Sequence, residues 1–242
     1  MPLSELLLVR HGESVGNVAA EAARSSDAHV IDVPARDADV TLSELGRQQA
    51  EAVGAALRAL PPQRRPQALA VSTYERARET ARLASGVAGL QLPTLVDERL
   101  RDRELGVLDR LTFKGVLARY PDEAERRQWQ GKFYHRPAGG ESWADVALRL
   151  RTWMSDLDRT ATERLLVVSH DVVIALLRYV CEGLEESQVL DLARDTPLRN
   201  ASISRLVRSE GGWRTASYDE VAHLRAAGLE VTEHQGERRA EP

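Results

Sequence analysis

Two histidines stand just beyond short apolar runs in this sequence. His11 follows Leu6–Val9 after one intervening residue, and His170 follows Leu165–Val168 in the same way. A neutral imidazole nitrogen can attack phosphorus and carry the phosphoryl group until water removes it. This reaction also needs cations on the phosphoryl oxygens and an acid for the leaving oxygen. Arginines and carboxylates brought close to these histidines would therefore complete a site for phosphoryl transfer.

The residues around His11 are of the types that phosphoryl transfer needs. Arg10 supplies a guanidinium whose planar fork matches two phosphate oxygens. Gly12 allows a sharp turn and a close approach of the backbone to an anion. Glu13-Ser14 then begins a helix, whose N-terminal amides also attract anions. An Arg-His-Gly triplet also arises by chance, so the triplet alone does not establish an enzyme.

The elements that must position these residues form an α/β fold. Leu6–Val9, Ala68–Val71 and Leu165–Val168 are typical of strands buried on both faces. Helical patterns lie between them, which predicts a three-layer α/β/α sandwich with a mostly parallel central sheet. Ligands of such sheets bind beyond the carboxyl ends of the strands. His11 and His170 are therefore expected at one edge of the sheet.

The remaining elements are predicted from apolar spacing and from turn residues. Residues 1–230 are expected to form one domain, and residues 231–242 a flexible tail. Residues 22–39 lack a clear period and are expected to be a loop with a short helical piece. The predicted helices are Ser43 to about Leu60, Tyr74–Leu83, Ser142–Leu157 and Val172–Val180, and the late strands are Ala201–Val207 and Trp213–Tyr218.

Several segments together resemble a known family. Arg10-His11-Gly12-Glu13-Ser14, with Asn17 after it, resembles the signature of the histidine phosphatase superfamily, branch 1, also called phosphoglycerate-mutase-like. The resemblance extends from residue 6 to about residue 205 and implies a phosphoglycerate-mutase-like fold. The further segments that carry it, in the family's order, are Leu42–Ala50, Ser72–Ala77 with Thr80-Ala81, Gly139–Ser142 and Val167–His170.

The resemblance implies a role for each matching residue. His11 would be the nucleophile that forms the phosphohistidine. Arg10, Arg76 and His170 would hold the phosphoryl oxygens, and Asn17 would be a further contact. For each arginine alone, a salt bridge at a helix end is the competing interpretation, and the combination with the histidines favours the phosphate site.

The proton donor is open among three carboxylates. The family usually has a glutamate four residues before a glycine, and Asp102 stands at that position before Gly106. Glu104 would share a face with Asp102 in an extended segment. Asp171 follows His170 directly, and a distant branch of the superfamily uses a His-Asp pair. Asp102 is the first choice, followed by Glu104 and then Asp171.

Residues 107–140 are expected to form a lid over the pocket. Their mixture of cations and aromatic rings fits a substrate with a second anionic group and a sugar or ring, and it equally fits a solvated helix face. The lid also resembles the fructose-2,6-bisphosphatase branch, in which the positions of Phe113, Arg127 and Trp143 help to hold the sugar phosphate. That branch has tyrosines at the first and third of these positions, so the particular sugar phosphate stays open.

The predicted function is hydrolysis of a small phosphate monoester, such as a sugar phosphate or bisphosphate. A phosphoglycerate mutase is the nearest alternative, since mutases of this family resemble phosphatases in every pocket residue but have a longer lid. A catalytically inactive binding protein of the same fold is the third. Retention of His11, Arg10, Arg76 and His170 argues against that third reading.

Composition and residue spacing also argue against several other kinds of protein. A net charge of −4 argues against a nucleic-acid partner, and no apolar stretch is long enough to span a membrane. The N-terminus lacks the pattern of a signal peptide, so the expected location is the cytoplasm. Cys181 is the only cysteine, which leaves no intrachain disulfide. No set of ligands has metal spacing, so we expect no metal and no cofactor; a homodimer is left open.

Overall fold

The centre of the protein is a six-stranded sheet with the strand order β3-β2-β4-β1-β5-β6. The structure is a computed structural model, and it describes residues 3–33, 36–157 and 162–233. The first four strands in this order are parallel, β5 runs antiparallel to β1, and β6 runs antiparallel to β5. The strands are β1 (Glu5–Arg10), β2 (Ala68–Val71), β3 (Thr94–Val96), β4 (Arg164–Ser169), β5 (Ile203–Ser209) and β6 (Gly212–Glu220).

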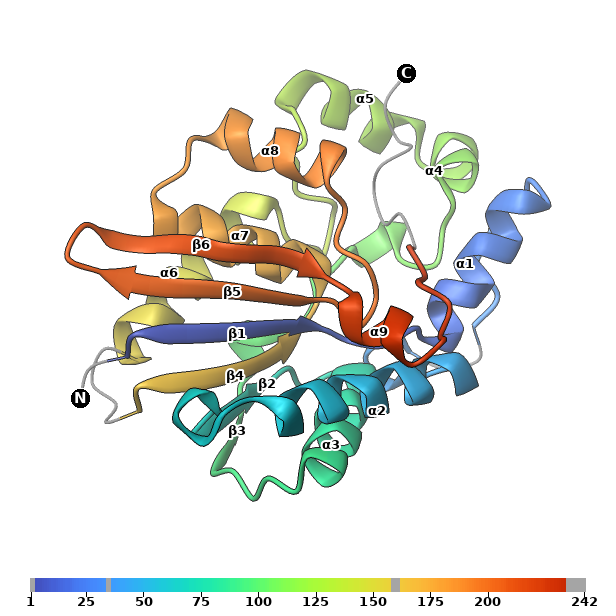
Figure 1. Ribbon diagram of the computed structural model, residues 1–242. Helices are drawn as coiled ribbons and strands as arrows, with labels where there is room; N and C mark the ends of the chain where they lie inside the picture. Colours follow the sequence, from blue (N-terminus) through green and yellow to red (C-terminus); the bar gives the residue numbers. More distant parts are fainter. Residues whose placement is uncertain (1–2, 34–35, 158–161, 234–242) are drawn as a thin grey trace.

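Helices cover both faces of the sheet, as Figure 1 shows. One face packs against α2 and α3, and a cluster of mostly small apolar side chains fills the space between. The other face packs against α6 and α7 through a second cluster that includes Trp143 and Trp153. The predicted α/β/α sandwich is therefore confirmed. The helices are α1 (Val15–Ser25), α2 (Glu44–Ala59), α3 (Glu75–Ala88), α4 (Phe113–Arg119), α5 (Pro121–Gln130), α6 (Trp143–Leu157), α7 (Asp171–Glu182), α8 (Glu186–Asp195) and α9 (Ala222–Ala226).

Most of the predicted helices and strands are confirmed. The differences lie in segments where the apolar pattern of the sequence is weak. The three buried strands and the helices α2, α6 and α7 lie where apolar spacing placed them. Residues 22–39, expected to be a loop with a short helical piece, contain the end of α1 up to Ser25 and a short 3-10 helix at Asp37–Asp39. Strand β3 was not predicted because it has three residues, all exposed. Residues 107–140, the predicted lid, contain α4 and α5, which the sequence analysis left without assigned structure.

The predicted tail lies only partly within the described residues. Thr232 is buried, its hydroxyl donates to Asn200 at 3.1 Å, and it accepts a bond from Gln49 at 3.0 Å. These contacts attach residues 231–233 to the domain. Residues 234–242 lie outside the described part of the chain.

The loop after β1 is packed closely against the first turn of α2. Glu13 accepts a main-chain bond from Ser43 at 2.9 Å, and its own N–H donates to the side chain of Gln49 at 2.9 Å. Two glycines make this approach feasible. A Cβ on Gly46 would lie 1.9 Å from the Glu13 carbonyl oxygen, and a Cβ on Gly12 would lie 2.4 Å from the Gly46 oxygen. The loop that carries His11 is thus held by α2.

Gly46→Ala is expected to destabilise the protein by about 3 kcal/mol, the upper part of the range for overpacking, because the added methyl would meet backbone rather than a movable side chain. Urea unfolding followed by circular dichroism measures this. The matched control is Gly86→Ala in α3, where a Cβ meets nothing within 4 Å. The control should stabilise the helix by roughly 0.5–1 kcal/mol. Equal stabilities for the two variants would contradict the proposed role of Gly46.

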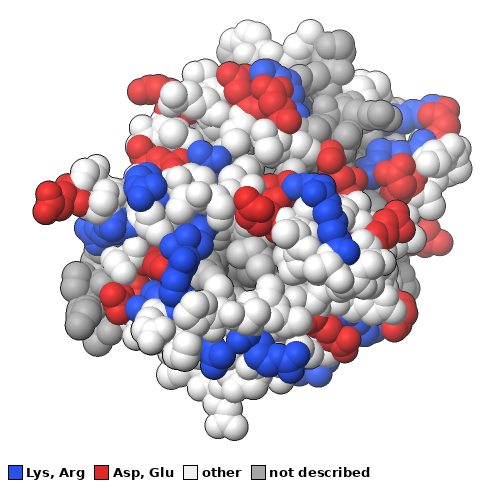
Figure 2. Space-filling view, viewed as in Figure 1, with Lys and Arg blue, Asp and Glu red and all other residues white. Residues whose placement is uncertain are grey.

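Charged side chains of both signs are interspersed over the face of the molecule seen in Figure 2. Many of them pair with neighbours, as Arg36 does with Asp39 at 3.1 Å. In the described ranges no helix is both long and apolar enough to cross a membrane.

Candidate active site

His11 lies in a buried position directly beyond β1, with its ring held by the backbone. Its Nδ1 is 2.7 Å from the carbonyl oxygen of Gly12. A carbonyl only accepts hydrogen bonds, so Nδ1 carries the proton and Nε2 keeps its lone pair. Burial, reinforced by the charges of Arg76, His170 and Arg10, holds the pKa of His11 well below its ordinary value. The ring is therefore neutral at neutral pH, as a nucleophile requires.

His170 is beside His11, directly beyond β4. The two ring centroids are 5.1 Å apart, and His170 is fully buried. Its Nε2 lies 2.8 Å from the Ser72 hydroxyl, which itself accepts a bond from the Tyr74 N–H. The Ser72 hydroxyl can donate to Nε2, and the Asp102 carboxylate beside Nδ1 can only accept, which favours the tautomer with the ring proton on Nδ1. That Nδ1 faces a carboxylate oxygen of Asp102 at 3.2 Å, without the alignment of a hydrogen bond.

Arg76 brings a buried guanidinium to the same place from the first turn of α3. Its Nη2 donates to Asp102 at 2.9 Å, and both terminal nitrogens contact Asp37. Its aromatic neighbour is Tyr74, whose ring centroid lies 4.8 Å from the guanidinium carbon. Burial disfavours the charge, but Asp37 and Asp102 outweigh it and raise the pKa of Arg76. Arg76 therefore stays protonated although its side chain is buried.

Arg10 ends β1, directly before His11, and Asn17 lies in the first turn of α1. Arg10 is buried, donates to the main-chain oxygen of Leu198 and lies 3.8 Å from Asp171. Asn17 forms the capping box of α1 with Ser14, whose N–H donates to the Asn17 Oδ1 at 3.1 Å. This bond is a structural role for Asn17. Its contact with phosphate stays a prediction.

Asp102 is the candidate acid that contacts the other site residues. One of its oxygens faces Arg76 and His170, and the other accepts the main-chain N–H of Arg103 at 2.9 Å. Burial alone would raise the pKa of Asp102, but the charges of His170 and Arg76 outweigh it and hold this pKa well below the usual range. Asp102 is therefore ionised while Arg76 is bound to it.

The other two candidate acids are placed less centrally. Glu104 is half exposed and accepts a hydrogen bond from the Tyr74 hydroxyl at 2.8 Å. Asp171 accepts from the main-chain N–H of Val172 at 2.8 Å, at the start of α7. Asp171 lies near Arg10, but neither carboxylate pairs with Arg76 or with His170, as Asp102 does.

The three lid residues named from the resemblance differ in their surroundings. Phe113, at the start of α4, is 39% exposed, and Arg127 is partly buried in α5. Trp143 is 1% exposed and belongs to the hydrophobic core beneath the sheet. It shares one helix face with Val146 and Leu150, which explains its burial. Such burial leaves Trp143 little surface to offer a substrate.

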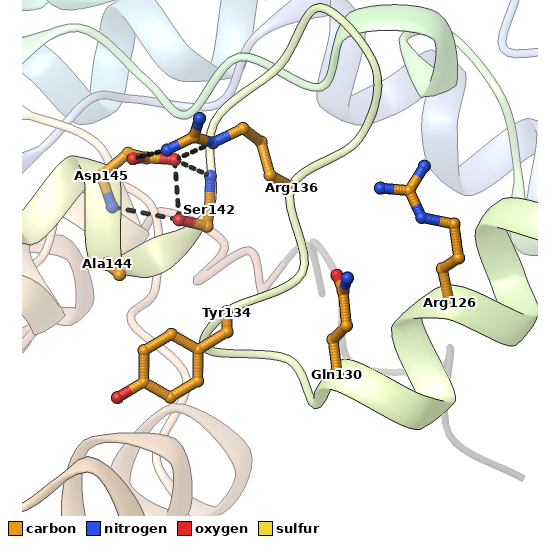
Figure 3. Close-up of a pocket in the computed structure, with 7 residues that line it drawn as sticks. All are labelled: Arg126, Gln130, Tyr134, Arg136, Ser142, Ala144 and Asp145. Atoms are coloured by element: carbon orange, nitrogen blue, oxygen red, sulfur yellow. Dashed lines mark hydrogen bonds and ion pairs between the residues drawn. The ribbon is translucent and has the colours of Figure 1, made fainter.

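A pocket of about 520 Å³ lies beside the lid, between α5 and the start of α6 (Figure 3). Its arginines are compensated, since Arg136 pairs with Asp145 and Arg126 with Glu123 at 3.1 Å. The pocket does not include the two histidines. Its lining residues are Arg126, Gln130, Tyr134, Arg136, Ser142, Ala144 and Asp145.

Four site residues were not given roles from the sequence. Ser72 and Tyr74 stand four and two residues before Arg76. Their closeness in sequence to this arginine could have indicated that they belong to the same site. Thr80 lies one helical turn after Arg76 and accepts the Gly12 N–H at 3.1 Å. Nothing in the sequence indicated that Asp37 belongs to the site, because its contact with Arg76 joins two segments that are distant in sequence.

Acidification below about pH 6.5 is expected to lower the free energy of unfolding, because buried histidines resist protonation in the folded protein. Burial lowers the pKa values of His11, His170 and His135 in the folded protein. The unfolded chain then binds protons more readily, with a pKa near 6.5. The stabilisation from the neutral rings is complete above that pH and is lost as the pH falls below it. Urea unfolding at pH 7.5 and 5.5 should give a lower free energy at pH 5.5; an equal or higher value would contradict this.

Known proteins are similar to this chain in sequence and in fold. The profile of the histidine phosphatase superfamily (branch 1) matches residues 6–221. A probable phosphoglycerate mutase of Erwinia tasmaniensis is 28% identical over 237 residues, covering 93% of this chain and 97% of that protein. A 2,3-bisphosphoglycerate-dependent phosphoglycerate mutase of Gloeobacter violaceus is 31% identical over 191 residues, covering 76% and 78%.

A solved structure gives the same picture. A mycobacterial glucosyl-3-phosphoglycerate phosphatase, in complex with VO3, superposes with a TM-score of 0.70 at 28% identity. The match covers 90% of this chain and 100% of that one. The phosphoglycerate-mutase-like fold predicted from the sequence is therefore confirmed. The resemblance of the lid to the fructose-2,6-bisphosphatase branch stays a prediction.

Proposed function

The chain belongs to the histidine phosphatase superfamily, branch 1, and from this premise we propose that it hydrolyses a small phosphate monoester through a phosphohistidine on His11. One observation carries the proposal: the neutral His11 ring presents Nε2 beside Arg76 and His170, with its other nitrogen fixed by Gly12. A nucleophile, cations and a carboxylate thus meet at one sheet edge.

In the proposed first step, Nε2 of His11 attacks phosphorus and the ester oxygen leaves on the opposite side. Arg10, Arg76 and the Nδ1–H of His170 would bind the three peripheral oxygens, whose negative charge they neutralise. His11 needs no general base, because its Nε2 already lacks a proton. The phosphorylated ring keeps its Nδ1 bond to the Gly12 carbonyl, which supports the charge that forms on the imidazole.

Asp102 is proposed to protonate the leaving oxygen, although it is ionised in the resting site. The phosphoryl group would share the positive charge of Arg76 with Asp102 and place negative charge beside the carboxylate. Both changes raise the pKa of Asp102, so the acid forms when substrate binds. In the second step the same carboxylate would take a proton from the attacking water. Its contacts with Arg76 and His170 support this choice over Glu104 and Asp171.

Mutase activity is the second candidate, because two of the relatives above are named as phosphoglycerate mutases. A mutase must retain its phosphohistidine and shield it from water. Here Glu104, which bonds the Tyr74 hydroxyl, is 49% exposed, and Phe113 in the predicted lid is 39% exposed. That openness supports hydrolysis. The candidate substrates are a phosphorylated sugar, a phosphorylated glycerate and a ring-containing phosphate ester. The name of the phosphatase relative, which specifies a phosphoglycerate derivative, supports this range.

The test is a release assay for inorganic phosphate over a panel of sugar phosphates, phosphoglycerates and aryl phosphates. Interconversion of 3- and 2-phosphoglycerate is measured alongside, with the bisphosphate present. The proposal predicts phosphate release that exceeds interconversion. Interconversion without net release would identify a mutase, and activity on no ester in the panel would contradict the proposed function.

Activity is expected to be unchanged by a chelator, because the proposed phosphate ligands are guanidinium and imidazole groups rather than a metal ion. Phosphate release is measured before and after dialysis against EDTA, and again after addition of Mg²⁺ or Zn²⁺. A loss on chelation that a metal restores would contradict the scheme.

A further inference from the structure

All four terminal N–H groups of Arg76 have acceptors in this structure. Nη1 donates to the main-chain oxygen of Asp37 at 2.7 Å and to its Oδ1 at 3.0 Å. Nη2 donates to Oδ2 of Asp37 at 3.2 Å and to Oδ2 of Asp102 at 2.9 Å. A guanidinium has four such N–H groups, so Asp37 accepts from three of the four.

The carboxylate of Asp37 binds Arg76 as a phosphoryl group would. A guanidinium holds carboxylates and phosphates through the same pair of parallel N–H bonds. A phosphate monoester that reaches His11 therefore finds this pair of bonds already made. It can bind Arg76 through these groups only by displacing a carboxylate.

Asp37 is the carboxylate that leaves at lower cost. Its side chain is 42% exposed, and within the described chain its carboxylate oxygens contact Arg76 alone. Asp102 is 22% exposed and is also held by the Arg103 N–H and by its position beside His170. Rotation of the Asp37 side chain toward water frees two N–H groups of Arg76, while its main-chain oxygen stays bound.

We propose that Asp37 competes with the phosphoryl oxygens of a ligand for Arg76 and so lowers the affinity of the site for phosphate groups. The identity of the ligand rests on the proposed function. Inorganic phosphate brings no alcohol group, so it displaces Asp37 at a net loss of affinity. An ester adds the contacts of its alcohol part and so binds in preference. Return of Asp37 to Arg76 then favours release of the phosphate product.

The test compares Asp37→Asn with Asp39→Asn. The first keeps the size of the side chain and removes the competing charge. The second is a matched control, since Asp39 lies two residues on in the same short helix and pairs with Arg36 at the surface. Binding of inorganic phosphate is measured by calorimetry at fixed pH and ionic strength, and KM and kcat are measured with an aryl phosphate.

Asp37→Asn should bind inorganic phosphate about tenfold more tightly than the wild type, with a comparable fall in KM and no rise in kcat. Asp39→Asn should match the wild type. A residue that merely orients Arg76 would give the opposite sign: weaker phosphate binding, higher KM and lower kcat in Asp37→Asn. That result, or no change, would overturn the proposal, and Asp37→Ser provides a second variant should the first unfold.

The two proposals fail separately. Calorimetry with inorganic phosphate needs no turnover, so tighter binding by Asp37→Asn would support the competition even if the wild type hydrolysed none of the esters. Conversely, hydrolysis by the wild type with unchanged phosphate binding in Asp37→Asn would leave the proposed function intact and overturn the role of Asp37.

Discussion

His11→Ala is expected to lower kcat for phosphate release by on the order of 10³-fold or more. The variant loses the only group in the site proposed to attack phosphorus, and Arg76 and His170 can then only bind the substrate. Alanine also removes the Nδ1 bond to Gly12, but the loop remains anchored to α2 through Glu13. Steady-state turnover of the best ester in the panel measures the effect.

His29→Ala is the matched control, because His29 is an exposed histidine outside the site. It should retain the turnover of the wild type. Retention of a tenth or more of the activity by His11→Ala would contradict the assignment of the nucleophile. An inactive binding protein would show no turnover in any of the three proteins, while still binding phosphate.

Asp102→Asn is expected to separate substrates by their leaving groups. An alkyl phosphate needs a proton on its leaving oxygen, so its kcat should fall by roughly 10²–10⁴-fold. p-Nitrophenyl phosphate has a stable leaving anion and should lose far less. Asparagine also changes the contacts with Arg76 and His170. Those changes affect both substrates alike, and the ratio between substrates therefore reports the acid.

Glu104→Gln is the control for Asp102→Asn, since Glu104 is two residues on and bonds the Tyr74 hydroxyl at 2.8 Å. It should affect the two esters equally and weakly. A leaving-group dependence in Glu104→Gln, together with an even loss in Asp102→Asn, would make Glu104 the acid. If each variant lost the same factor in kcat for both esters, the proton donor would be Asp171 or water.

The sheet edge was predictable because the signals that define it are local and strong. Four consecutive apolar residues bounded by polar ones mark β1, β2 and β4, and parallel strands bring their carboxyl ends together. Knowing the strand positions was therefore enough to place His11 and His170 at the same edge of the sheet, while the pairing of β1 with β4 that makes them neighbours was not predicted. Strand β3 carries no such signal, since all three of its residues are exposed.

The surroundings of Arg76 were not predictable, because they depend on contacts between distant segments. Asp37 lies in a stretch without periodicity, and nothing in that stretch indicates which cation it meets. Trp143 shows the reverse case. A resemblance placed it in the lid, whereas its spacing from Val146, Leu150 and Trp153 already indicated the buried face of α6.

The most direct test is to locate the phosphoryl group during turnover. The enzyme is mixed with excess substrate, quenched at alkaline pH, where phosphohistidine survives, and mapped by peptide mass spectrometry. The account predicts one phosphoryl group on His11, which disappears as substrate is exhausted and is absent in His11→Ala. A phosphoryl group on another residue, or turnover with none on the enzyme, would contradict it.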